Sequence, residues 1–233
     1  MQNLLSLIWS SVGKKLINAL TGLALVLFII VHLIGNLKLL YGDPGPFNHY
    51  AHFYEALGVF LYVVELGLVA VFLFHALMGA AVWLDKRRAR PVAYKKEANA
   101  GGPSKKTWSS KNMIITGLVL FVFTIIHLKH FKYGAGVAEG YIFTTESGDQ
   151  VRDLYRLVIE GFSNIYVVIA YTVAMILLGF HLRHGFWSAF QSLGVQHPRL
   201  VPLIYTVGII VAILLAVGFV FLPVYIYFVG GAA

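Results

Sequence analysis

Five long stretches of the chain contain almost no charged side chains. They cover residues 16–37, 56–84 with the single interruption of Glu65, 112–128, 161–182 and 200–233. A bilayer-spanning helix needs about 20 mainly apolar residues, so each stretch is long enough to cross a membrane once. Only 12% of the 233 residues are charged, roughly half the share of a soluble domain. The sequence therefore predicts an all-α integral membrane protein, a single transmembrane domain built as a five-helix bundle.

The positions of the basic residues predict how this bundle is oriented. We expect helices at about 16–38, 56–84, 111–130, 161–188 and 201–228, joined by an outer loop at 39–55, a basic inner loop at 85–110 and a structured outer loop at 132–159. If successive helices alternate in direction, only Lys38, Lys129, Lys132, Arg152 and Arg156 lie on one side, which leaves 13 of the 18 basic residues on the other. The basic side is expected to be cytoplasmic, with the N-terminus inside and the C-terminus outside a prokaryotic inner membrane.

This charge distribution also limits the class of partner. A net charge of +8 could suggest nucleic acid, but the basic residues gather at one membrane face. Topology, anionic lipid or a cytoplasmic protein partner explains that placement better. The N-terminal segment lacks basic residues ahead of its apolar part, and we expect a short interfacial helix there rather than a cleaved signal.

The chain contains no cysteine. Disulfides, covalently attached haem, thiolate-bound iron–sulfur clusters and cysteine-based zinc sites are therefore excluded within it. Any iron–sulfur chemistry must belong to a partner subunit.

One sequence motif occurs twice in the predicted helices. The segments that begin at Thr21 and Thr116 both read T-G-L-x-L-x-x-F-x-I-x-H-L, and their histidines are His32 and His127. Eleven residues are close to three helical turns, so threonine and histidine share a face about 16 Å apart. A second repeat, "FHALMG" at 74–79 and "FHLRHG" at 180–185, places a glycine one turn after each histidine. Because glycine has no side chain, that spacing leaves room for a large, flat ligand beside the imidazole.

The depths of these four histidines predict two pairs. Counted from the basic side, His32 and His127 lie at one depth, named here the outer pair, and His75 and His181 lie nearer the basic side, named the inner pair. The levels differ by roughly 10 Å. One imidazole from each of four helices, at two levels, is the arrangement for two stacked bis-histidine haem groups. Histidines that only hydrogen-bond a neighbouring helix, a non-haem metal site and a duplication without a cofactor are the alternatives.

These residues resemble the cytochrome b membrane-anchor subunit of succinate dehydrogenases and fumarate reductases, in its single-chain, two-haem form. The similarity runs from about Ser10 to the end of the last helix and is most specific in "SSVGKKLINALTG", "VHLIGN", "FHALMG", "PVAYKKE", "TGLVLFVFTIIHLKHF", "LYRLVIEGF" and "GFHLRHGFWSAFQSLG". It implies two haem b groups, with the inner pair and the outer pair as iron ligands. It also implies a flavoprotein and an iron–sulfur partner on the cytoplasmic face, and electron transfer to a membrane quinone, commonly menaquinone.

Further site residues are expected around the two haem levels. Haem propionates favour cations, hydroxyls and amides, and the candidates near the inner pair are Asn18, Arg183, His184, Lys111 and Ser11, of which Asn18 matches a family position close to the inner haem. Glu65 and His52 are the candidates for quinone binding and proton transfer. Two other functions stay open: a dihaem cytochrome b subunit of a hydrogenase or formate dehydrogenase, and a membrane anchor or transporter without a cofactor.

Overall fold

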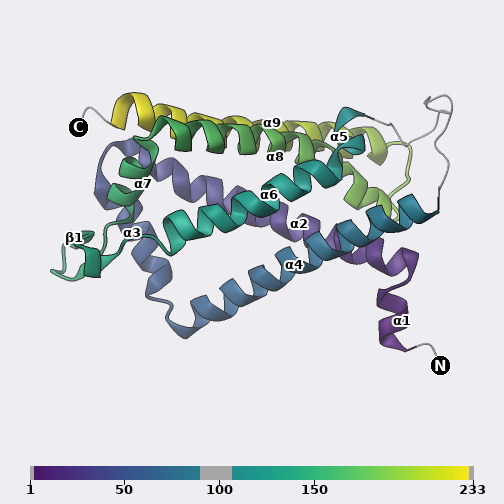
Figure 1. The fold of residues 1–233 in the computed structure, drawn as a ribbon, viewed down its shortest axis with the longest axis horizontal. Coiled ribbons are helices and arrows are strands. Elements are labelled where there is room, and N and C mark those ends of the chain that lie inside the picture. The colour runs from purple at the N-terminus through teal and green to yellow at the C-terminus, as the bar shows by residue number, and fades with distance from the viewer. Residues whose placement is uncertain (1–2, 90–106, 231–233) are drawn as a thin grey trace.

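The computed structural model describes residues 3–89 and 107–230, and the five apolar stretches form five long helices (Figure 1). The prediction of an all-α membrane bundle with five spans is confirmed. The spans are α2 (Ser11–Asn36), continued by the 3-10 turn η1 (Leu37–Tyr41); α4 (Val59–Arg88); α6 (Met113–His127), continued by the π-helix η2 (Leu128–Lys132); α8 (Ile165–Ser192); and α9 (Leu200–Val229).

The shorter elements precede or connect these spans. They are α1 (Leu4–Ile8), α3 (Pro44–Glu55), α5 (Trp108–Lys111), η3 (Val137–Glu139), β1 (Ile142–Thr144), β2 (Gln150–Arg152) and α7 (Leu154–Phe162). The strands form an antiparallel hairpin that pairs Ile142 with Arg152. The motif "PVAYKKE" and the linker around Gly101 lie outside the described residues.

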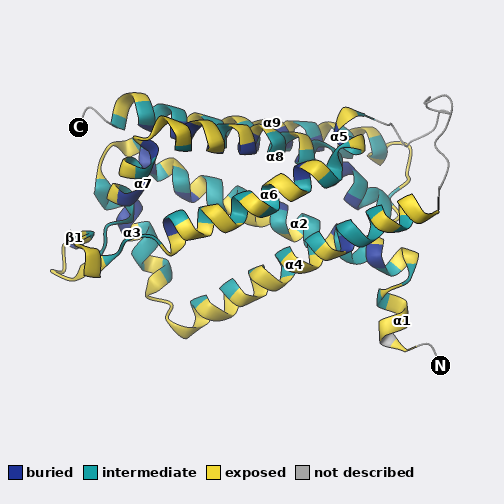
Figure 2. Ribbon diagram, viewed as in Figure 1, coloured by how far each residue is buried: buried dark blue, intermediate teal, exposed yellow. Residues whose placement is uncertain are grey.

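Helix α2 is the centre of the bundle, because it packs against α4, α8 and α9, while α6 packs mainly against α8. Helix α4 runs along the edge and diverges from its neighbours toward one end (Figure 1). Exposed residues cover most of α4 and the outward faces of the other spans (Figure 2). Most of these side chains are apolar, which is the surface a helix needs where it meets lipid rather than water.

The end of the bundle opposite the basic residues carries a folded cap. Helices α3 and α7 pack on each other there, next to the β-hairpin (Figure 1). Asn48 of α3 is fully buried; its side chain donates to Asp153 Oδ1 at 2.7 Å and accepts from the Tyr155 amide at 2.9 Å. An amide satisfied on both sides fixes α3 to the start of α7.

The prediction of a loop at 39–55 is wrong, because η1 and α3 fill most of it. Asp43 is the N-cap of α3 and accepts from the Gly45 amide at 2.8 Å, and Pro44 occupies the first helical position. Both residues favour helix initiation, so the signal was present in the sequence. The loop at 132–159 is structured as expected, and α7 ends at Phe162, before a new start at the N-cap Asn164 of α8.

A short N-terminal helix, α1, precedes the first span, as expected. Leu5, Leu7 and Trp9 are exposed, which suits a segment that lies against a lipid interface. Gly13 of α2 makes the close turn possible, because a Cβ there would lie 2.1 Å from the Leu7 carbonyl oxygen.

Candidate functional site: two histidine pairs

The inner pair joins α4 to α8 across the basic half of the bundle. The ring centroids of His75 and His181 lie 6.3 Å apart, with the ring planes at 71°. Each histidine is set one turn before a glycine of its own helix. Gly79 faces Asn18 of α2, since a Cβ there would lie 3.5 Å from Asn18 Oδ1, and Gly185 faces Met113.

Each inner histidine is held by the threonine of one repeat. Thr116 Oγ1 lies 3.0 Å from His181 Nδ1, and Thr21 Oγ1 lies 3.4 Å from His75 Nδ1. His75 Nδ1 also lies 3.1 Å from the Asn18 carbonyl oxygen. The threonine hydroxyls donate to carbonyls of their own helices, Thr116 to Met113 and Thr21 to Ile17.

A hydroxyl that already donates its proton can only accept at the imidazole. The Asn18 carbonyl oxygen can only accept, so Nδ1 of His75 carries the proton and its Nε2 keeps the lone pair. His181 has the same tautomer when the Thr116 proton lies on the Met113 carbonyl. The glycine after each threonine lets the ring approach: a Cβ at Gly22 would lie 3.0 Å from His75 Cε1, and one at Gly117 would lie 3.5 Å from His181 Cε1. The T-G dipeptide of both repeats thus serves a histidine of a different helix, which the sequence did not reveal.

The outer pair joins α2 to α6. The ring centroids of His32 and His127 lie 5.8 Å apart, and the rings are perpendicular. The phenylalanine of each repeat stacks on the histidine one turn later: Phe28 on His32 at 5.5 Å and Phe123 on His127 at 5.7 Å. The threonine, glycine, phenylalanine and histidine of the repeat therefore all belong to or contact one of the two pairs.

Tyr171 of α8 reaches the outer pair from the side. Its hydroxyl lies 3.4 Å from His127 Nδ1 and 3.3 Å from His130 Nδ1. His130 belongs to the π-helix η2, whose wider turn begins directly after His127. π-Helical turns inside α-helices occur often at functional sites. The apolar periodicity gave no sign of η2 or of the contact to Tyr171.

Arg152 of β2 holds the end of η2. Its guanidinium donates to four backbone carbonyls, those of Phe131, Lys132, Gly134 and Ala135, at 2.8–3.1 Å. Partial burial lowers the pKa of this arginine from its ordinary value. Carbonyls at a helix end have no partner within the helix, so one side chain of the cap satisfies the end of the span that carries His127.

Tyr50 of α3 closes the outer end above the "HLIGN" segment. A Cβ at Gly35, three residues after His32, would lie 2.3 Å from the Tyr50 hydroxyl oxygen, so only glycine fits at this position. Burial, followed by a hydrogen bond and charge interaction with Tyr54, raises the pKa of Tyr50 to about 12. The phenol is therefore neutral at physiological pH and packs as an uncharged lid of the cap.

The two candidates for quinone chemistry lie at the end of the bundle that carries the cap. Glu65 of α4 forms an ion pair with Lys132 at the end of η2, and both side chains are partly exposed. This pair links the diverging end of α4 to the helix of His127. His52 of α3 has a buried Nδ1 atom without a hydrogen-bond partner in the described part of the chain.

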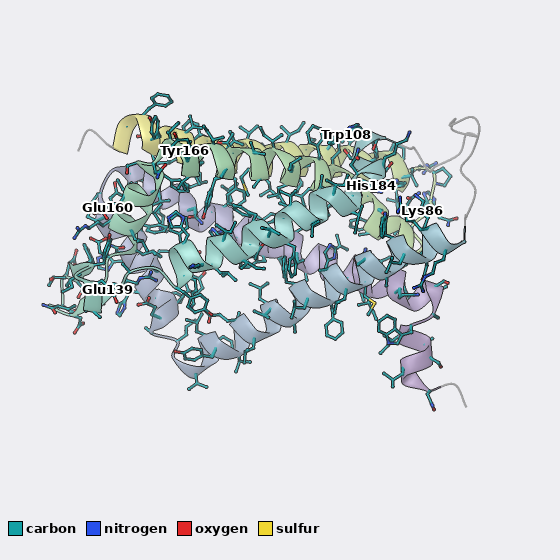
Figure 3. The ribbon with its side chains drawn as sticks, viewed as in Figure 1. Lys86, Trp108, Glu139, Glu160, Tyr166 and His184 are labelled. Atoms are coloured by element: carbon teal, nitrogen blue, oxygen red, sulfur yellow. The ribbon has the colours of Figure 1, made fainter. Side chains whose placement is uncertain are left out.

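The candidates near the inner pair divide into three groups. Asn18 has a buried Oδ1 atom that no described donor reaches, and His184 lies close to Lys86 at the basic end (Figure 3). Ser11 and Lys111 are exposed at the basic ends of α2 and α5. Arg183 lines a groove between α8 and α9, away from the face of His181. The neighbouring Lys14, by contrast, is buried and paired with Asp85 of α4.

Comparison with known proteins adds no identity. No family model matches the chain, and no curated protein or solved structure matches it significantly. The geometry of the histidine pairs is therefore the main ground for a function.

Proposed function

We propose that this chain is the dihaem cytochrome b membrane anchor of a succinate:quinone oxidoreductase. In this role His75 and His181 would hold the iron of one haem b, and His32 and His127 would hold the iron of a second. The observation that carries the proposal is the meeting of four imidazoles from four helices as two facing pairs.

The spacing within each pair supports this ligand role. Two imidazoles bound through nitrogen to opposite sides of one metal have centroids about 6 Å apart, given metal–nitrogen bonds of about 2 Å. The observed separations are 6.3 Å for the inner pair and 5.8 Å for the outer pair. A direct hydrogen bond between two imidazole nitrogens would bring the ring centroids closer together than this. No such bond joins either pair within the described residues.

The number of protein ligands also favours haem over a bare metal ion. Among the described residues, no group of three or more His, Cys, Asp or Glu side chains converges as a metal site. Haem needs only two protein ligands because the porphyrin supplies the other four nitrogens. The contacts of Thr21, Asn18 and Thr116 engage Nδ1 of His75 and His181 and leave Nε2 of each ring free to bind iron. This agrees with the rule that a metal-bound histidine donates the N–H of its other ring nitrogen to an acceptor.

Haem b held by these two histidine pairs would supply one-electron transfer, because an iron held by two protein histidines has no free position for oxygen. The chain itself would supply the ligands: Thr21 and Thr116 orient the inner pair, and Phe28 and Phe123 stack on the outer pair. The unpartnered Oδ1 of Asn18 and the imidazole of His184 are the groups that we assign to the polar edge of the inner site.

The two ends of the bundle suit different tasks. The basic end fits a cytoplasmic flavoprotein and iron–sulfur subunit, since its cations can meet an acidic surface. At the opposite end, His52 and the Glu65–Lys132 pair are the groups that we assign to quinone binding and proton exchange, with menaquinone as the expected quinone.

Haem content tests the ligand assignment. The purified full chain should contain two haem b per polypeptide. His75→Ala should remove one haem and leave the spectrum of the other unchanged, whereas His127→Ala should remove the other. The assignment is contradicted if the wild-type chain contains fewer than two haems, or if His75→Ala and His127→Ala lose the same haem.

Isolation of the intact membrane complex tests the partner assignment separately. A flavoprotein and an iron–sulfur subunit should accompany the chain, and succinate should reduce its haems. Reduction by hydrogen or formate instead, with two haems retained, would refute the succinate:quinone role and leave the histidine pairs as haem sites.

A further inference from the structure

Helices α8 and α9 enclose a groove of about 580 Å³ on the surface of the bundle. The side chains from α9 follow one stripe, at Ile209, Ile213, Ala216, Val220 and Val224. This stripe runs over 16 residues, from Ile209 to Val224, or about 22 Å of helix axis. The groove is therefore long and narrow and runs parallel to the spans.

Small residues form the floor of the groove. Gly179 of α8 lies so close to α9 that a Cβ there would be 2.8 Å from the Ala216 Cβ. Small residues allow two membrane helices to approach closely, while larger side chains such as Ile213 and Val217, which are 56% and 61% exposed, stand along the rim. Because the groove lies within two membrane spans, its apolar walls face hydrocarbon rather than water.

Among the residues that the structure describes, Arg183 is the one charged residue that lines the groove. It is two residues from His181, about 200° around the helix, so its side chain leaves α8 on a different face from the inner pair. No hydrogen bond or ion pair of Arg183 occurs within residues 3–89 and 107–230. A partly buried guanidinium in a span needs an anion, and its planar fork matches the oxygens of a phosphate.

We propose that the α8–α9 groove binds one anionic phospholipid, with the headgroup phosphate on Arg183 and an acyl chain along the α9 stripe. The end of the groove at Arg183 is the basic end of the bundle, where cations attract anionic lipid. A neutral isoprenoid tail could fill the apolar part but would leave the guanidinium without a counter-ion. The proposal is independent of the haem function, since none of the four histidines lines the groove.

Lipid binding to the delipidated full chain tests the proposal, for example by native mass spectrometry with phosphatidylglycerol and phosphatidylcholine. The wild type should prefer phosphatidylglycerol by about fivefold, the factor expected for one basic residue at the lipid phosphate. Arg183→Gln should remove this preference, and Arg183→Lys should keep part of it. Val217→Trp should weaken both lipids by filling the groove while leaving the charge in place.

Arg199→Gln is the matched control, because Arg199 is an exposed cation at the same end but does not line the groove. It should leave the preference unchanged. Equal loss of preference in Arg183→Gln and Arg199→Gln would mean a diffuse electrostatic attraction and would overturn the site. Binding of a neutral quinone that competes with phosphatidylglycerol and is unaffected by Arg183→Gln would assign the groove to an isoprenoid tail instead.

Discussion

Replacing Thr116 by valine removes one hydroxyl from the face of α6 that meets His181 and changes the side-chain volume little. Thr116 is almost fully buried, and its Oγ1 lies 3.0 Å from His181 Nδ1. No other acceptor for this nitrogen is present among the described residues. The matched substitution, Thr21→Val, is milder, because His75 Nδ1 keeps the Asn18 carbonyl oxygen at 3.1 Å.

The size of the effect follows from the hydrogen bond that is lost. An acceptor on Nδ1 makes the ligating nitrogen more basic, which stabilises ferric iron over ferrous iron and lowers the midpoint potential. A neutral hydrogen bond contributes about 1 kcal/mol, and for one electron about 1.4 kcal/mol corresponds to 59 mV. With the inner pair holding haem as proposed, and with half or more of the bond energy differing between the two oxidation states, Thr116→Val should raise the midpoint potential of that haem by about 20–40 mV.

A redox titration of the purified chain, monitored by haem absorbance, measures this shift. The potential of the proposed outer haem should move by less than about 10 mV, since Thr116 contacts only the inner pair and the field of one hydroxyl dipole falls off steeply with distance. Thr116→Ser should restore the wild-type potential, and Thr21→Val should shift the inner haem by roughly half as much or less. A downward shift, equal shifts for the two valine variants, or a larger change at the outer haem would refute the reasoning.

Two further predictions concern the cap. Arg152→Lys should lower the stability of the folded chain by roughly 2–3 kcal/mol, because a lysine cannot reproduce four guanidinium hydrogen bonds to carbonyls of residues 131–135; thermal unfolding measures this, and an unchanged midpoint contradicts the role of Arg152 in holding η2. Tyr50 should ionise near pH 12 instead of the ordinary 10.0. Since folding raises this pKa, its contribution to stability is complete below pH 10 and is lost as the pH rises toward 12. Tyrosinate absorbance checks the titration, with Tyr50→Phe as the control.

Much of the bundle could be predicted from the sequence, because hydrophobicity and helical periodicity are local properties. Five uncharged stretches of sufficient length predicted five spans, and the structure has them. Equal depth predicted that His32 would meet His127 and that His75 would meet His181, since helices that cross the same bilayer share a common scale of height. Their rings lie side by side in the structure.

Some features were encoded locally but passed over. Asp43 and Pro44 form a helix start, and the distance of two residues from His181 to Arg183 already places the two side chains on different faces of α8. Proximity in the sequence suggested that Arg183 belonged near the inner haem. The groove between α8 and α9 shows it facing another way.

Counting residues along the apolar stretches was enough to predict the five membrane spans and the histidines that stand at the same height. The rotation of each helix about its own axis could not be predicted this way and is seen only in the folded bundle. That rotation puts Thr21 and Thr116 on the histidines of neighbouring helices, Arg152 on the end of η2, and Arg183 in a groove. The physical reason is that rotation depends on where small residues such as Gly22 and Gly179 let two backbones or a ring approach closely, and this fit exists only between segments far apart in the chain.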